Sequence, residues 1–285
     1  MISGTSGVSV EFDRETVLRD VDFTVPAGSV VAVVGGDGAG KSTLLRCLVG
    51  RILPSAGEVR HPDRRLIGYM STRSGTWRQL TVGENIDFVG GAFSMSRSDL
   101  DRRRTDLLER AKLTDAVDRL AGDLSGGMRQ KLGFVLAMLH DPELLVLDEP
   151  STGVDPVSRV ELWRLIAEAA AAGTAVAMAT SYLDEAERAH NVTVLDGGRV
   201  IAAGTRDEVM VSFPGCITAP DRAMEPAASW RRGSRLREWN GEETSIAATG
   251  ARPLRLDELD FEDVVIASLL HDRSSASDDQ ESISP

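Results

Sequence analysis

Residues 35–43 of this 285-residue chain read Gly35-Gly36-Asp37-Gly38-Ala39-Gly40-Lys41-Ser42-Thr43. The apolar run at 30–34 before them predicts a buried strand, and Leu44 and Leu45 after them predict the beginning of a helix. Because glycine adopts positive φ angles at little cost, such a loop can point several N–H groups at one anion. The positive end of the following helix attracts the same anion. The pattern therefore predicts a phosphate-binding loop, with a tight turn as the alternative.

The lysine and serine of this pattern predict which ligand the loop binds. A lysine in this place reaches the β and γ phosphates of a nucleoside triphosphate, and the serine hydroxyl ligates the Mg²⁺ that the nucleotide carries. We therefore expect Lys41 and Ser42 to bind the Mg-nucleotide together with the backbone of the loop.

Two consecutive carboxylates, Asp148 and Glu149, follow the apolar run at 144–147. A buried strand that presents acids at its carboxyl end is typical of the second half of a nucleotide-hydrolysis site. Asp148 is expected to hold the Mg²⁺ shell, and Glu149 to orient or deprotonate the attacking water. The alternative is a strand end with two solvated acids.

A third motif lies between these two. Ser125, Gly126 and Gly127 stand directly before a helical pattern whose apolar residues recur every three or four positions. This sequence predicts a helix N-terminus that is open to an anion, although taken alone it indicates no more than a good helix cap.

Strands that alternate with helices predict an α/β fold. We expect a P-loop NTPase-type parallel sheet core with N-terminal antiparallel strands, an inserted helical subdomain and a small C-terminal appendage. The expected division is a nucleotide-binding domain over 1–211, with the helical subdomain at about 85–140, an accessory segment over 212–270 and a disordered tail over 271–285.

The composition is that of a soluble globular protein, with 42% hydrophobic and 27% charged residues. The net charge of −12 argues against nucleic acid as a partner. Cys47 and Cys216 have no metal-type spacing, and free thiols favour a cytosolic location. We see neither a membrane-spanning run nor a signal peptide, so membrane association is expected to come through a partner.

The three motifs in this order resemble the nucleotide-binding domain of ABC transporters, and the resemblance covers about residues 6–211. It implies a head-to-tail dimer, homomeric or heteromeric, that encloses two ATP molecules with Mg²⁺. Ser125, Gly126 and Gly127 would then bind the ATP of the second domain, and Phe12 would stack on adenine or else be a core strand residue. The resemblance also implies a membrane-spanning permease subunit, docked near the helical subdomain and the 72–79 loop. The chain would then be cytoplasmic, on the inner face of the cell membrane.

Two positions depart from the family pattern. Ser181 stands where relatives carry a histidine that contacts the γ-phosphate, and Thr72 stands where they carry a glutamine that senses Mg²⁺. Loss of one preorganised donor commonly costs about 10²–10³ in rate. We therefore hypothesise slow ATP hydrolysis, with Ser181 recovering part of the lost interaction. Thr72 is expected at the Mg²⁺ site with Ser42 and Asp148. His190 lies nearby in the sequence, but we expect it on the surface.

Residues 151–156 and 182–186 resemble the export branch of the family, which moves drugs, antibiotics, lipids or polysaccharides. In the same loop, Asp155 before Pro156 also fits a helix N-cap. Two alternatives remain open at this stage. One is a soluble ABC ATPase of translation or DNA repair, and the other is a nucleotide-gated scaffold that hardly hydrolyses ATP.

Overall fold

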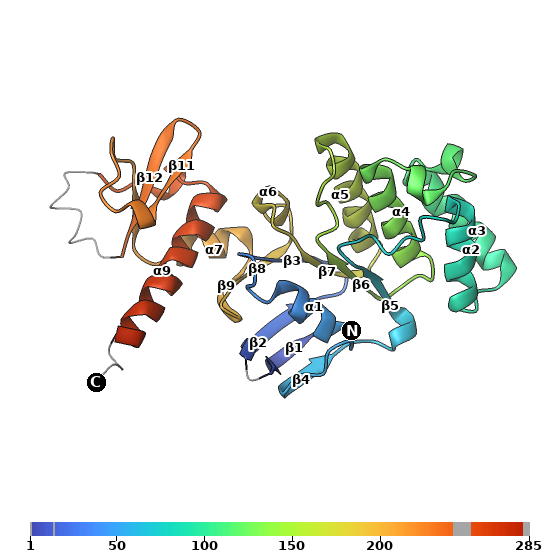
Figure 1. Cartoon of the computed structure of the whole chain (residues 1–285), viewed down its shortest axis with the longest axis horizontal. Helices are drawn as coiled ribbons and strands as arrows, with labels where there is room; N and C mark the ends of the chain where they lie inside the picture. Colours follow the sequence, from blue (N-terminus) through green and yellow to red (C-terminus); the bar gives the residue numbers. More distant parts are fainter. Residues whose placement is uncertain (1, 14, 242–251, 282–285) are drawn as a thin grey trace.

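The computed structural model describes residues 2–13, 15–241 and 252–281 of the chain (Figure 1). Its centre is a six-stranded sheet in the order β5-β6-β7-β3-β8-β9. The first five strands in this order run parallel, and β9 is antiparallel to β8. The bounds are β3 (Val30–Gly35), β5 (Ile67–Met70), β6 (Leu144–Asp148), β7 (Ala175–Ala179), β8 (Asn191–Asp196) and β9 (Arg199–Gly204). The expected α/β fold with a parallel sheet core is confirmed.

The topology of this sheet brings the sequence motifs together. Strand β3 runs into the glycine loop, β6 ends at Asp148, and Ser181 follows the end of β7. Strands β6 and β7 are buried along their whole length, as their continuous apolar sequences predict. Because β6, β7 and β3 are parallel neighbours, the glycine loop, the Asp148-Glu149 pair and Ser181 all follow the carboxyl ends of their strands on the same side of the sheet.

An antiparallel sheet of three strands covers part of the core, in the order β2-β1-β4 (Figure 1). Its strands are β1 (Ser3–Phe12), β2 (Glu15–Val25) and β4 (Ala56–Arg60). Together with helix α1 (Lys41–Leu48), this sheet encloses the smaller of two hydrophobic clusters. The sequence did not predict β4, because Val59 is its only apolar residue apart from Ala56 and no alternation is visible.

All the regular elements between β5 and β6 are helices, as expected for an inserted helical subdomain at about 85–140. It contains α2 (Val82–Ala92), α3 (Arg97–Arg110) and α4 (Gly126–Met138), and short 3₁₀ helices at Thr114–Ala116 and Ala121–Asp123. Helix α2 begins at Val82, where Thr81 and Glu84 form a reciprocal capping box. Helix α5 (Pro156–Ala171) follows β6 and packs beside α4 (Figure 1).

The C-terminal segment comprises the described residues from β10 (Cys216–Thr218) to α9 (Phe261–Glu281). It lies at the opposite end of the molecule from α2 and α3 (Figure 1). It has a sheet in the order β10-β12-β11 and a long helix. The remaining elements are α6 (Leu183–Ala186), α7 (Arg206–Ser212), β10 (Cys216–Thr218), β11 (Ser229–Arg232), β12 (Arg235–Asn240), α9 (Phe261–Glu281), and 3₁₀ helices at Arg64–Leu66, Pro226–Ala228 and Leu256–Glu258.

The C-terminal segment shares one hydrophobic cluster with the central sheet. Ile217, Trp239 and Val264 belong to the same cluster as Ala32 and Val192. The division near residue 211 stays a prediction. Helix α9 continues to Glu281, where the sequence predicts a disordered tail over 271–285, and residues 282–285 lie outside the described part. Within the described ranges, no helix is long and apolar enough to cross a membrane.

Candidate nucleotide site

The glycine loop after β3 is closely packed by the chain around it. Gly38 and Gly40 have φ angles of +80° and +103°, a region that side-chain-bearing residues rarely adopt. A Cβ at Gly40 would lie 2.6 Å from the Leu18 side chain, and one at Gly35 would lie 2.1 Å from the Leu195 carbonyl oxygen. The predicted loop therefore depends on glycine for both its backbone angles and its close contacts.

Lys41, the first residue of α1, folds back over this loop. Its Nζ donates hydrogen bonds to the carbonyl oxygens of Gly35 at 2.8 Å and Gly36 at 3.1 Å. The side chain is 8% exposed. A buried ammonium group that donates to two carbonyl oxygens is well placed to bind an anion, because charged acceptors form the stronger hydrogen bonds.

Ser42 and Asp148 form the centre of the predicted metal site. The Ser42 hydroxyl donates to Oδ1 of Asp148 at 2.8 Å, and Asp148 is fully buried. Its second oxygen, Oδ2, is buried and has no hydrogen-bond partner among the described residues. Unpaired buried carboxylate oxygens are costly, whereas a carboxylate and a hydroxyl beside a phosphate site are what Mg²⁺ binds. The two side chains therefore fit Mg²⁺.

Among the described residues, Thr72 forms no hydrogen bond with this pair. No described residue forms a hydrogen bond with its hydroxyl, and it lines a separate cavity of about 530 Å³ beside Gly126, Arg129 and Thr152. The structure therefore leaves the predicted metal role of Thr72 without a contact to support it.

Glu149 is held in an unusual conformation by its neighbours. Its φ is +54°, in the left-handed region that costs a residue with a side chain about 1–3 kcal/mol and that clusters at active sites. The Ser181 hydroxyl donates to Oε1 at 2.7 Å and the Ser181 N–H to Oε2 at 3.1 Å, while Thr152 donates to Oε2 at 3.1 Å. Ser181 is therefore a direct partner of the predicted catalytic carboxylate.

His190 is remote from this group. Its Nδ1 accepts a hydrogen bond from the N–H of Val30 at 3.0 Å, at the amino end of β3. The glycine loop follows the carboxyl end of the same strand. His190 is exposed, as expected, and cannot take the place of the histidine that Ser181 replaces.

The Ser-Gly-Gly motif caps helix α4. The Ser125 hydroxyl accepts from the N–H of Met128 at 3.2 Å, and a Cβ at Gly127 would lie 2.3 Å from Oγ of Ser158 in α5. The cavity beside Gly126 is lined by described residues of the 72–78 loop, α4 and the loop after β6, and by none of the glycine loop. The motif and Lys41 of one chain therefore do not share that cavity.

Phe12 is not a core residue, which removes the alternative reading of this position. It ends β1 and is 46% exposed. The β1–β2 hairpin packs against the glycine loop, since a Cβ added at Gly40 would lie 3.1 Å from the Val17 carbonyl oxygen. An exposed aromatic ring on this hairpin is available to a ligand.

A buried carboxylate that the motif analysis did not single out links two loops of the site. Glu185, 4% exposed, accepts hydrogen bonds from Ser151 at 2.8 Å, Thr180 at 2.9 Å and Arg159 at 3.0 Å. It joins the loop after β6 to the end of β7 and to α5. Nothing in the local sequence signals this network, because its members are up to 34 residues apart.

Asp155 is the N-cap of α5. Its Oδ1 accepts from the N–H groups of Val157 at 3.1 Å and Ser158 at 3.0 Å. The side-chain hydrogen bond from Ser158, with these backbone bonds, lowers the pKa of Asp155 below its ordinary value. The capping role indicated by Asp155 and Pro156 is confirmed.

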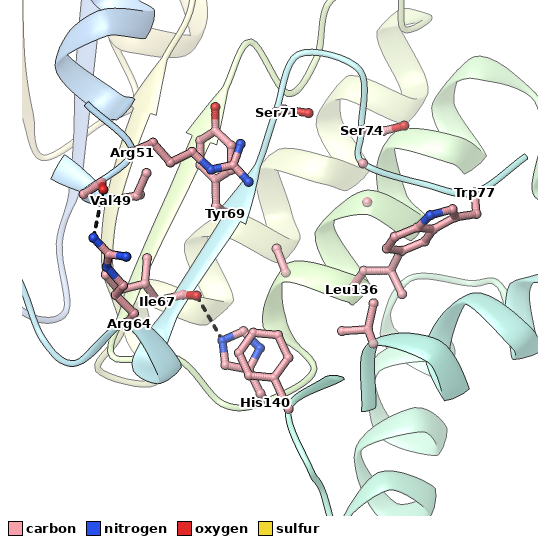
Figure 2. A pocket seen from close by; sticks show the side chains of 16 residues that line it. Val49, Arg51, Arg64, Ile67, Tyr69, Ser71, Ser74, Trp77, Leu136 and His140 are labelled. Atoms are coloured by element: carbon pink, nitrogen blue, oxygen red, sulfur yellow. Dashed lines mark hydrogen bonds between the residues drawn. The ribbon is translucent and has the colours of Figure 1, made fainter. Parts of the chain in front are cut away.

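A larger cavity of about 570 Å³ opens between the central sheet and the helical region (Figure 2). Arg51 lies over the ring of Tyr69 at 4.5 Å, and His140 stacks on Phe93 at 3.7 Å. None of the described residues that line this cavity is acidic. They are Val49, Gly50, Arg51, Arg64, Ile67, Tyr69, Ser71, Ser74, Gly75, Trp77, Val89, Phe93, Gly133, Leu136, Ala137 and His140.

His140, which lines this cavity, makes the stability of the folded chain sensitive to acid. Burial lowers the pKa of its imidazole below the usual 6.5, and its nitrogen Nε2 lies 3.1 Å from the Ile67 carbonyl oxygen (Figure 2). The histidine is therefore protonated at a higher pH in the unfolded chain than in the folded one. Stability is lost as the pH falls from about 6.5 through the folded pKa, by at most about 1.4 kcal/mol per pH unit.

Replacing His140 with phenylalanine should make the free energy of unfolding less sensitive to acid. Urea unfolding at pH 7.5 and pH 5.5 measures it, and the decrease between the two pH values should be smaller in His140→Phe than in the unaltered chain. Equal losses in both proteins would contradict this assignment.

Three groups meet at the carboxyl ends of the parallel strands: the glycine loop, the Ser42–Asp148 pair and Glu149. Together they define a phosphate-loop nucleotide-binding protein. The sequence profile of the ABC transporter family matches residues 18–152. A solved ATP-binding subunit of an ABC transporter is similar in fold, with a TM-score of 0.68 and 30% identity over 73% of this chain and 92% of that chain.

Curated relatives agree with this match. "Nod factor export ATP-binding protein I" of Rhizobium johnstonii is 35% identical over 222 residues, 74% of this chain and 71% of that protein. "Daunorubicin/doxorubicin resistance ATP-binding protein DrrA" of Streptomyces peucetius is 37% identical over 220 residues, 73% of this chain and 67% of that protein. The chain belongs to the ABC transporter family, among its ATP-binding proteins.

Another relative is about twice as long as this chain. "Probable multidrug ABC transporter ATP-binding protein YbhF" of Escherichia coli (strain K12) is 39% identical over 194 residues, which are 65% of this chain and 34% of that protein. The similarity therefore covers about a third of that relative.

Proposed function

We propose that this chain binds and hydrolyses Mg-ATP in a head-to-tail dimer and thereby powers export through a separate membrane permease. The observation that carries the proposal is the meeting of Lys41, the Ser42–Asp148 pair and Glu149 at one sheet edge. The printed names of the relatives, which include drug resistance and Nod factor export, support the export direction. The transported substrate is expected to be selected by the permease.

Each side chain has one proposed role. Lys41 leaves the loop carbonyls to bind the β and γ phosphates, and Glu149 orients and deprotonates the attacking water. Ser42 and Asp148 hold Mg²⁺, which neutralises charge that develops on the phosphates. Phe12 stacks on the adenine ring, and Ser125, Gly126 and Gly127 bind the γ-phosphate of the partner's ATP.

We further propose that hydrolysis is slow. The Ser181 hydroxyl donates to the carboxylate of Glu149, and a serine side chain is shorter than the histidine of relatives. The same observation favours the second candidate, a nucleotide-gated scaffold that hardly turns over. Phosphate release by the purified chain under saturating Mg-ATP separates the two candidates, since the scaffold would bind the nucleotide without measurable release.

The permease is proposed to dock in the 570 Å³ cavity of Figure 2. This cavity includes Ser74, Gly75 and Trp77 of the 72–79 loop that was expected at the permease contact. Its aromatic and arginine side chains suit a helix with apolar and acidic residues. Such docking would hold this chain at the inner, cytoplasmic face of the cell membrane.

Trp77→Ala tests the docking site. Trp77 is 41% exposed and packs on Phe88 at 4.4 Å, so its loss should weaken binding of the permease about 30-fold, as for a central aromatic anchor. The measurement is recovery of the permease from detergent extract by the tagged chain. Leu256→Ala, at a residue 45% exposed in the C-terminal segment, is the matched control. Equal recovery by both variants would place the permease elsewhere.

A further inference from the structure

Helix α9 of the C-terminal segment reaches the phosphate loop through Arg273. Its Nε donates to Oδ2 of Asp196 at 3.0 Å, and its Nη2 to Oδ1 at 3.3 Å. The Asp196 side chain is 11% exposed, whereas that of Arg273 is 60% exposed. A two-pronged arginine–carboxylate contact fixes the orientation of the guanidinium plane as well as its position.

The position of Asp196 explains why this contact lies beside the loop. Asp196 ends β8, and the preceding Leu195 pairs with Gly35 of β3. The next residue of the loop, Gly36, faces the arginine directly: a Cβ at Gly36 would lie 3.2 Å from Nη2 of Arg273. A side chain at Gly36 would have to displace the guanidinium group.

Gly36 therefore lies next to two cations. Lys41 donates to its carbonyl oxygen at 3.1 Å, and Nη2 of Arg273 lies 3.2 Å from the place that a Cβ on Gly36 would take. Lys41 is expected to leave the carbonyl when a nucleotide binds, whereas Arg273 has a carboxylate partner that stays with the sheet. Arg273 can thus hold the second residue of the loop in place while Lys41 moves.

We propose that Arg273 is a positioning residue of the phosphate loop, through which the C-terminal segment raises the affinity for nucleotide. The proposal rests on the proposed Mg-ATP binding and adds a regulating element to it. Because coupling between two sites is reciprocal, bound nucleotide should also strengthen the docking of α9. A half-exposed ion pair limits the effect on affinity to about fivefold.

Arg273→Met tests the proposal, with Arg255→Met as the matched control. Arg255 belongs to the same segment and pairs with Asp257, and its side chain is 69% exposed. Mg-ATP binding is measured by titration calorimetry in a Glu149→Gln background, and KM and kcat are measured with Glu149 intact. Arg273→Met should raise Kd and KM by about threefold to fivefold and leave kcat unchanged. Asp196→Asn should do the same, and the double variant should show no further loss.

Hydrogen exchange of the loop at 35–41 gives a readout that needs no nucleotide. Exchange should quicken in Arg273→Met and not in Arg255→Met, and Mg-ATP should slow exchange in α9 of the unaltered chain. Unchanged Kd and unchanged loop exchange in Arg273→Met would overturn the positioning role, even if the variant melts earlier. A chain that binds no Mg-ATP at all would instead overturn the proposed function and the claim about affinity with it.

Discussion

Replacing Glu149 with glutamine should lower steady-state ATP turnover by about 10²- to 10⁴-fold, because a positioned general base commonly contributes this much. The amide keeps the size of the side chain but cannot accept the proton of the attacking water. Mg-ATP binding should persist, since the hydrogen-bond partners of the Glu149 side chain among the described residues are Ser181 and Thr152, and not Lys41, Ser42 or Asp148. Phosphate release under saturating Mg-ATP measures turnover, and calorimetry measures binding.

Glu143→Gln is the matched control for this experiment. Glu143 precedes β6 directly, whereas Glu149 follows its end, and the Glu143 side chain is exposed. This variant should turn over like the unaltered chain. Equal turnover in all three proteins would remove Glu149 from the proposed chemistry. Loss of Mg-ATP binding in Glu149→Gln would show that the carboxylate shapes the nucleotide site rather than the reaction.

The parts of the site that sequence analysis located are local in the chain. The glycine loop is specified by consecutive residues, and the Asp148-Glu149 pair follows a strand that its own apolar run predicts. Parallel pairing of β3, β7 and β6 then brings the two motifs to one edge without further information. The sequence predicted the parallel strands themselves, whereas their order in the sheet is known from the structure.

Contacts between distant segments were not predictable in this way. Glu185 draws three donors from three different elements, and Arg273 meets Asp196 across 77 residues. Both side chains lie in polar sequence that is equally typical of a solvated surface. Strand β4 was missed for a related reason: it gains its stability from pairing with β1 rather than from an apolar pattern of its own.

Ser181→His should raise ATP turnover by at least about tenfold in the assembled transporter, because one preorganised donor to developing charge is worth about 10²–10³ in rate and serine supplies part of it. The position is exposed, so a larger ring can be accommodated. The N–H of residue 181 would still hold Oε2 of Glu149, as it does at 3.1 Å now. An imidazole could then contact the γ-phosphate and the attacking water, which the serine hydroxyl, bonded to Oε1 at 2.7 Å, does not.

Ser181→Ala separates this explanation from a simpler one. If the hydroxyl slows the reaction only by occupying the Glu149 carboxylate, removing it should raise turnover as much as histidine does. If histidine supplies a missing donor, alanine should leave turnover unchanged or lower, because Glu149 loses the 2.7 Å hydrogen bond and gains nothing. Phosphate release by the permease complex of each variant decides between them. A histidine variant no faster than the unaltered chain would remove the basis for a slow site.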